Sequence, residues 1–217
     1  MKQCFGRVAA LLTLVLASSA TAQERDPLVR LSPTVRYAVE VILDSARLVG
    51  LPTQPIESKA LEGLSKRQDD RRILFAVRNV FRSLREARSA LGPTATEGEL
   101  TAAASALRVG VTNAELSQLA SSRKGKQVTV PLVVLVDLVS RGVPRDTASL
   151  TIFQLWQRGV ADDDFYGLWR GVERDIVSGA DPGAALLNRA REIPNRPSPV
   201  QPPPSDGRSD QSENQNR

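Results

Sequence analysis

A glycine that follows an apolar run recurs along this chain and constrains the fold more than any other feature. In the clearest copy, at 138–146, Gly142 can take the left-handed backbone conformation that ends a helix. Val143 can then fold back onto the last turn, and Pro144 suits a first helical position. The sequence therefore predicts a series of helices that end at such corners. Further copies contain Gly110, Gly159 and Gly179, and weaker ones lie at Gly50, at Gly92 and, without glycine, at 66–69.

The spacing of the corners predicts how the helices are arranged. Corners near 50, 67, 92, 110, 125, 142, 159 and 179 lie 15 to 25 residues apart, so short connections alternate with helices of similar length. Neighbouring helices joined by short turns are expected to run antiparallel. We therefore expect an all-α fold of about eight or nine short antiparallel helices, arranged as an irregular helical-hairpin array, like a helical repeat, or as a compact bundle.

Cap residues and apolar spacing set the expected helix ends. Ser32 precedes Pro33, Asp69 precedes the most regular amphipathic pattern, and Thr96 and Thr112 each open a capping box with a glutamate three residues later. The expected helices cover about 33–49, 56–66, 70–91, 97–109, 128–139, 144–158, 162–178 and 182–191, with one more from 113 to a polar loop at 121–126. Their apolar stripes predict a core that includes Val35, Ile42, Ile73, Val77, Val80, Leu84, Leu107, Leu135, Ile152, Leu155, Phe165, Leu168 and Ile176.

The segment 128–139 carries conflicting signals. Its valines favour a strand, but Pro131 would interrupt a central strand. Leu132, Leu135 and Val139 fit helical spacing, and Gly142 would end a helix there as the other glycines end theirs. We therefore expect a helix.

The beginning and end of the chain differ from the rest. Lys2 and Arg7, an apolar run at 8–17 and small residues at 20–22 have the form of a secretory signal peptide over 1–22. Such a leader predicts an exported protein, periplasmic or secreted, and no later segment suggests a transmembrane helix. We expect one α-helical domain at 23–193 and a disordered, Pro-rich polar tail at 194–217.

Composition excludes several kinds of chemistry. The chain has no histidine, and its one cysteine, Cys4, lies in the leader, so the mature protein lacks disulfides, thiolates and histidine-ligated metals. The 29 basic and 24 acidic residues lose Lys2 and Arg7 with the leader, which leaves a net charge near +3. That charge is too small to indicate a nucleic-acid partner. No cofactor or catalytic site is expected, because no pair of acids is singled out by its spacing.

An acidic segment resembles a calcium-binding loop in part. Asp162, Asp164, Gly167 and Glu173 occupy positions one, three, six and twelve of an EF-hand pattern, but Tyr166 and Arg170 would be poor ligands at positions five and nine. The competing interpretation is that the acids at 162–164 cap a helix, where negative charge is favourable. We favour the cap and expect no metal site.

Two surfaces are candidates for binding. Arg71, Arg78, Arg82 and Arg85 form a basic stripe on the helix at 70–91, joined by nearby Lys66, Arg67, Arg72 and Arg88. The stripe could hold an anionic polymer or lipid headgroup, or it could be a solvated face with local pairs such as Arg82–Glu86. Five aromatic residues fall in one pair of neighbouring helices, where Trp156, Tyr166 and Trp169 could form a platform for sugars or could pack between the helices.

These observations lead to two hypotheses for function. The first is an exported, non-catalytic helical interaction module that binds a protein or an anionic envelope component. The alternative is a carbohydrate- or peptidoglycan-binding protein, or a carbohydrate-active one, that uses the aromatic platform with nearby acids such as Asp163. Exposure of the three rings separates the two hypotheses.

Overall fold

The computed structural model describes residues 27–122 and 125–193, which form helices joined by turns and contain no strand in those ranges. The signal peptide expected at 1–22 and the tail expected at 194–217 lie outside the described residues. The elements are η1 (Pro27–Arg30), a 3-10 helix, and the α-helices α1 (Pro33–Leu48), α2 (Gln54–Ser65), α3 (Asp70–Leu91), α4 (Glu97–Arg108), α5 (Asn113–Ser122), α6 (Thr129–Ser140), α7 (Arg145–Gln157), α8 (Asp162–Val177) and α9 (Pro182–Glu192).

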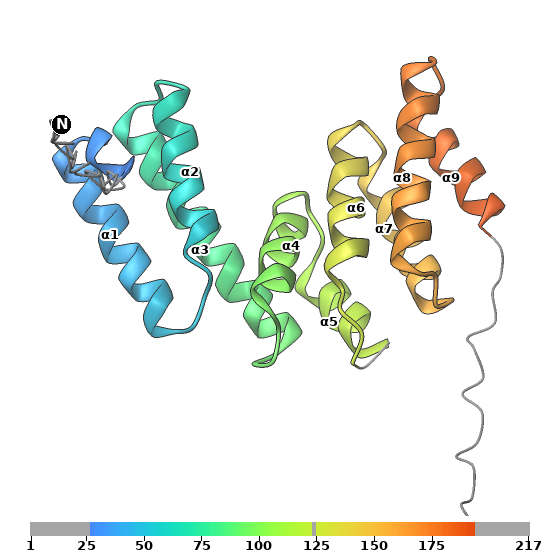
Figure 1. The fold of residues 1–217 in the computed structure, drawn as a ribbon, viewed down its shortest axis with the longest axis horizontal. Coiled ribbons are helices and arrows are strands. Elements are labelled where there is room, and N and C mark those ends of the chain that lie inside the picture. The colour runs from blue at the N-terminus through green and yellow to red at the C-terminus, as the bar shows by residue number, and fades with distance from the viewer. Residues whose placement is uncertain (1–26, 123–124, 194–217) are drawn as a thin grey trace, which may run out of the picture.

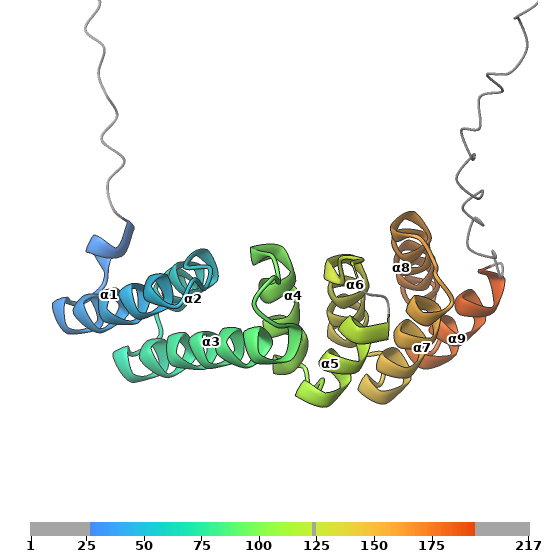
Figure 2. The same ribbon diagram turned by 90° about the horizontal axis from the view of Figure 1, so that it is seen from below.

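The helices form a closely packed row with α1 and α9 at opposite ends (Figure 1). Figure 2 shows two layers, with α2, α4, α6 and α8 on one side and α3, α5, α7 and α9 on the other. The main contacts join helices that lie one or two positions apart along the chain, such as α3 with α4 and α4 with α6. Of the two arrangements left open by the sequence, the described residues therefore adopt the extended array.

The valine-rich segment is the helix α6, which confirms the helical interpretation of 128–139. Pro131 lies in its first turn, where a missing N–H is tolerated. Leu132, Leu135 and Leu138 are fully buried along one side. Burial on helical spacing outweighs the strand preference of the valines.

Five glycine corners, at residues 50, 110, 142, 159 and 179, share one hydrogen-bond pattern, whereas the N–H of Gly92 donates to the carbonyl of Arg88. Gly142 has φ +93°; its N–H donates to the carbonyl of Val139 at 3.0 Å, and the N–H of Val143 donates to that of Leu138 at 3.1 Å. This is the Schellman arrangement, and it buries Val143 to 2% exposure against the preceding helix. Gly110, Gly159 and Gly179 have φ values of +99°, +81° and +95° directly after α4, α7 and α8. At the corner without glycine, Arg67 has φ +52° and forms the same pair of bonds, through its own N–H and that of Gln68.

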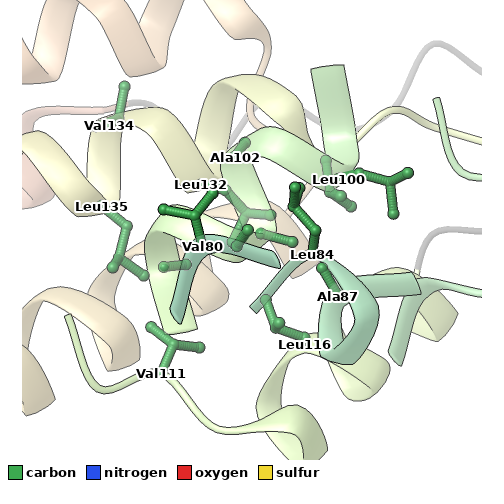
Figure 3. Packing of buried hydrophobic residues seen from close by; sticks show 14 of the residues in the cluster. Val80, Leu84, Ala87, Leu100, Ala102, Val111, Leu116, Leu132, Val134 and Leu135 are labelled. Atoms are coloured by element: carbon green, nitrogen blue, oxygen red, sulfur yellow. The ribbon is translucent and has the colours of Figure 1, made fainter. Parts of the chain in front are cut away.

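Most residues expected in the core are buried, and Ile42, Leu107 and Ile176 are half-buried at its edge. The buried side chains of α4 were not predicted from the sequence. Figure 3 shows α4 between α3 and α6, with Leu84 of α3, Leu100 of α4 and Leu132 of α6 pointing toward one another. The small side chains of α4 allow both neighbours to approach closely, and four of its alanines are buried: Ala102, Ala103, Ala104 and Ala106.

We expect Gly142→Ala to destabilise the protein and Gly167→Ala to stabilise it. A Cβ at residue 142 would meet only Pro182 Cγ, at 3.8 Å, so the expected loss of about 1 kcal/mol comes from the positive φ. Gly167 lies inside α8 with no atom within 4 Å of its Cβ position, so alanine there should add about 0.5–1 kcal/mol. Urea denaturation measures both changes. A Gly142→Ala protein that is as stable as the unchanged protein, or more stable, would show that the corner does not need glycine.

Candidate functional site

The long helix α3 has an inner face that packs and an outer face that does not. Asp69 caps its start by accepting a hydrogen bond from the Arg72 N–H at 2.9 Å, and Gly92 follows its end with φ +88°. Figure 2 shows α1 and α2 on one side of α3. The inner face is a stripe at intervals of four and three residues, each at most 3% exposed: Ile73, Val77, Val80, Leu84 and Ala87.

The four arginines of the basic stripe lie on the outer face. At about 100° per residue, Arg71, Arg78, Arg82 and Arg85 fall within about 60° of the helix circumference and extend about 21 Å along it. All four are exposed, and none of them forms a hydrogen bond or an ion pair with another described residue. The ion pair expected between Arg82 and Glu86 is not formed, and no hydrogen bond joins these two side chains.

An exposed aromatic ring lies within the stripe. Phe75 is four residues after Arg71 and three before Arg78, and it is 67% exposed. Phe75 was not predicted to belong to the stripe, although its spacing from Arg71 and Arg78 places it on the same side of the helix. We call the set of Arg71, Phe75, Arg78, Arg82 and Arg85 the α3 surface. A large apolar side chain surrounded by cations is an arrangement that can meet an anionic and partly apolar partner.

Three of the four other basic residues near the stripe are engaged within the fold, and Arg67 is exposed without a side-chain partner among the described residues. Lys66 pairs with Glu62 at 2.6 Å, and Arg72 pairs with Asp69 at 3.4 Å. Hydrogen bonds from Lys59 and Lys66 lower the pKa of the Glu62 carboxyl to about 2. These side chains are therefore less available to a partner than the four arginines of the α3 surface.

Arginines elsewhere hold corners in place. Arg88, on a different face of α3, donates to the carbonyls of Gly50 and Pro93, each at 2.7 Å, and so joins the corner after α1 to the loop after α3. Arg145 makes the same kind of bond to the carbonyl of Gly110 at 2.7 Å. Its hydrogen bond to Asp146 is the main cause that holds the pKa of the Arg145 guanidinium above its usual value.

Two further arginines fix the last helices. Arg189 of α9 forms two hydrogen bonds with Asp175 of α8, both 2.7 Å long, and these bonds lower the pKa of the Asp175 carboxyl. Arg141 pairs with Glu173 at 2.7 Å, and its guanidinium lies 5.5 Å from the ring centre of Trp169. The paired arginines therefore stabilise the fold, whereas the four of the α3 surface lie in one line on a single helix without a partner among the described residues.

The three rings of the aromatic platform do not share one open surface. Trp156 is 2% exposed, and its Nε1 donates to the carbonyl of Leu119 at 3.1 Å. Trp169 is half-buried against the core, and its Nε1 is buried. Only Tyr166 of the three is exposed, at 41%. The platform is therefore not formed in this structure, because packing between the helices takes up the two tryptophans.

The segment that resembles a calcium loop is helical. Asp162, Asp163 and Asp164 form the first turn of α8, after Ala161 as the N-cap, and Glu173 is engaged with Arg141. The acids therefore stabilise the start of the helix from within its first turn. Among the described residues, no three acidic, cysteine or histidine side chains come close enough together to hold a metal ion.

Comparison with known proteins adds no assignment to this geometry. No protein-family model, no curated protein and no solved structure matches the chain. Within residues 27–122 and 125–193, no helix has both the length and the apolar character needed to span a membrane.

We expect Arg88→Met to cost about 2 kcal/mol or more of folding free energy, whereas Arg85→Met should change it by less than about 0.5 kcal/mol. Arg88→Met removes the charged hydrogen bonds to Gly50 and Pro93, but Arg85 has no partner to lose. Arginine and methionine have similar helix propensities, so the comparison isolates the contacts. Denaturant unfolding of both variants measures the difference. Equal losses would contradict the division between structural and free arginines.

Proposed function

We propose that this protein is an exported, non-catalytic helical interaction module that binds an anionic component of the cell envelope through the α3 surface. The observation that carries the proposal is the line of four exposed, unpaired arginines around Phe75. Export rests on the form of the segment at 1–22.

Electrostatics explain why such a surface suits an anionic partner. Each exposed arginine near an anionic surface contributes about 1 kcal/mol of attraction, and the planar guanidinium binds phosphate or carboxylate through paired hydrogen bonds. Four of them on one rigid helix are held in register without any ordering of the chain on binding. The exposed ring of Phe75, between Arg71 and Arg78, adds apolar contact to the surface.

The carbohydrate-binding alternative required three exposed rings on one groove. Because Trp156 is buried and Trp169 is half-buried, the structure offers that alternative no platform.

The test replaces the four arginines together. We expect the variant with Arg71, Arg78, Arg82 and Arg85 all changed to glutamine to bind anionic phospholipid vesicles and anionic polysaccharide at least about tenfold more weakly than the unchanged protein at low salt. Co-sedimentation measures binding to both materials. Raising the salt to about 0.5 M should release the unchanged protein, because screening shortens the range of the attraction.

The matched control changes four exposed arginines outside α3 to glutamine: Arg30, Arg170, Arg174 and Arg191. This control variant has the same net charge as the test variant. Equal loss of binding in both variants would show that net charge and not the α3 surface is responsible. Turnover of purified peptidoglycan by the mature protein would contradict the non-catalytic assignment.

A further inference from the structure

A groove of about 550 Å³ lies between the start of α2 and the helices α4 and α6. Its surface is largely apolar and includes Pro55 of α2, Ala102 of α4, and Val133 and Val136 of α6. Val133 is 37% exposed, which places an apolar side chain at the solvent edge. The α3 surface takes no part in this groove.

The carboxylate of Asp137 is the feature of the groove that the fold does not explain. Asp137 is the sole polar residue between Val130 and Val139, and it lines the groove half-buried. It lies in the last turn of α6, where the helix dipole disfavours negative charge. It forms no hydrogen bond or ion pair through its side chain with any described residue. The carboxylate therefore weakens α6 and gains no partner within the described chain.

A second carboxylate lies on the same groove. Glu97, in the first turn of α4, is exposed and likewise has no side-chain partner among the described residues. None of the described residues that line the groove is basic. Two unpaired negative charges on an apolar groove are complementary to a positive charge carried on an apolar body.

We propose that this groove binds a basic amphipathic peptide segment of a partner protein. An arginine or lysine of the segment pairs with Asp137 and Glu97, and apolar side chains cover Ala102, Val133 and Val136. A groove of this volume holds several side chains, and helical segments commonly bind in grooves between helices. This ligand is positively charged, whereas the partner proposed for the α3 surface is negatively charged. The two sites also share no residue, so each can be tested separately.

The test uses three helical peptides of about 12 residues that have the same leucine–alanine sequence and differ at one central position, which is Arg, Leu or Glu. Fluorescence anisotropy measures their affinity for the mature protein, and NMR of the methyl groups of Val133 and Val136 places the site. We expect the Arg peptide to bind at least about tenfold more tightly than the Leu peptide and the Glu peptide to bind most weakly. Equal affinities would overturn the proposal.

Variants of the protein then test whether the Asp137 carboxylate gives the groove its preference for the Arg peptide. Asp137→Asn should lose the preference for the Arg peptide without loss of thermal stability, because the change removes a charge that the helix dipole disfavours. Val133→Lys should also abolish binding, since it places an ammonium group one turn before Asp137. Asp163→Asn, at an exposed carboxylate of α8, is the matched control and should leave binding unchanged. An Asp137→Asn protein that keeps the preference would overturn the proposal.

Two further measurements distinguish this site from the α3 surface and from a site for small cations. The variant with the four α3 arginines changed to glutamine should bind the Arg peptide as the unchanged protein does, whether or not it has lost its anionic partner. n-Hexylguanidinium supplies the cation on a short apolar chain without a peptide backbone. If it binds as tightly as the Arg peptide, the groove is a site for small cations and the peptide assignment is wrong.

Discussion

The inner face of α3 is the interaction on which the rest of the structure depends. Through the stripe that includes Val77, Val80 and Leu84, this helix packs against α1, α2, α4 and α5, and so joins the first hairpin to the remainder of the row. Burial of five such side chains is worth several kcal/mol, at about 1.5–3 kcal/mol for each large one. The same packing determines which residues of α3 face solvent. The inner residues fix the rotation of the helix, so the four arginines about half a turn away must face outward.

The alanines of α4 explain why the row continues beyond α3. A helix that packs on both sides needs small side chains, since large ones would hold its neighbours apart. Ala102, Ala103, Ala104 and Ala106 supply that narrow centre between α3 and α6. Each later helix then repeats the arrangement by packing on helices one or two positions away, so the two layers grow in one direction instead of closing into a bundle.

Local signals in the sequence predicted much of this fold, and long-range contacts account for what they missed. Glycine corners and capping boxes depend on residues within one or two turns, so α6 could be recognised as a helix despite its valines. The buried alanines of α4, and the choice between exposure and packing for Trp156, depend on which helices meet, and spacing along one helix does not show that. For the candidate site, the four arginines could be found from their spacing. Only the three-dimensional contacts show that these four arginines lack partners, whereas Arg88 and Arg145 have them.

An extended row also allows two surfaces of opposite charge to exist on one small protein. In a closed bundle of this size, a line of four arginines and a pair of unpaired carboxylates would lie within a short distance of each other and attract. Here the arginines occupy the outer face of α3, and Asp137 and Glu97 line a groove between α2, α4 and α6 to which the α3 surface contributes no residue. None of the described residues that line the groove is basic, and the α3 surface contains no acidic residue. Each surface can therefore keep its charge unpaired, which a binding surface requires and a purely structural one does not.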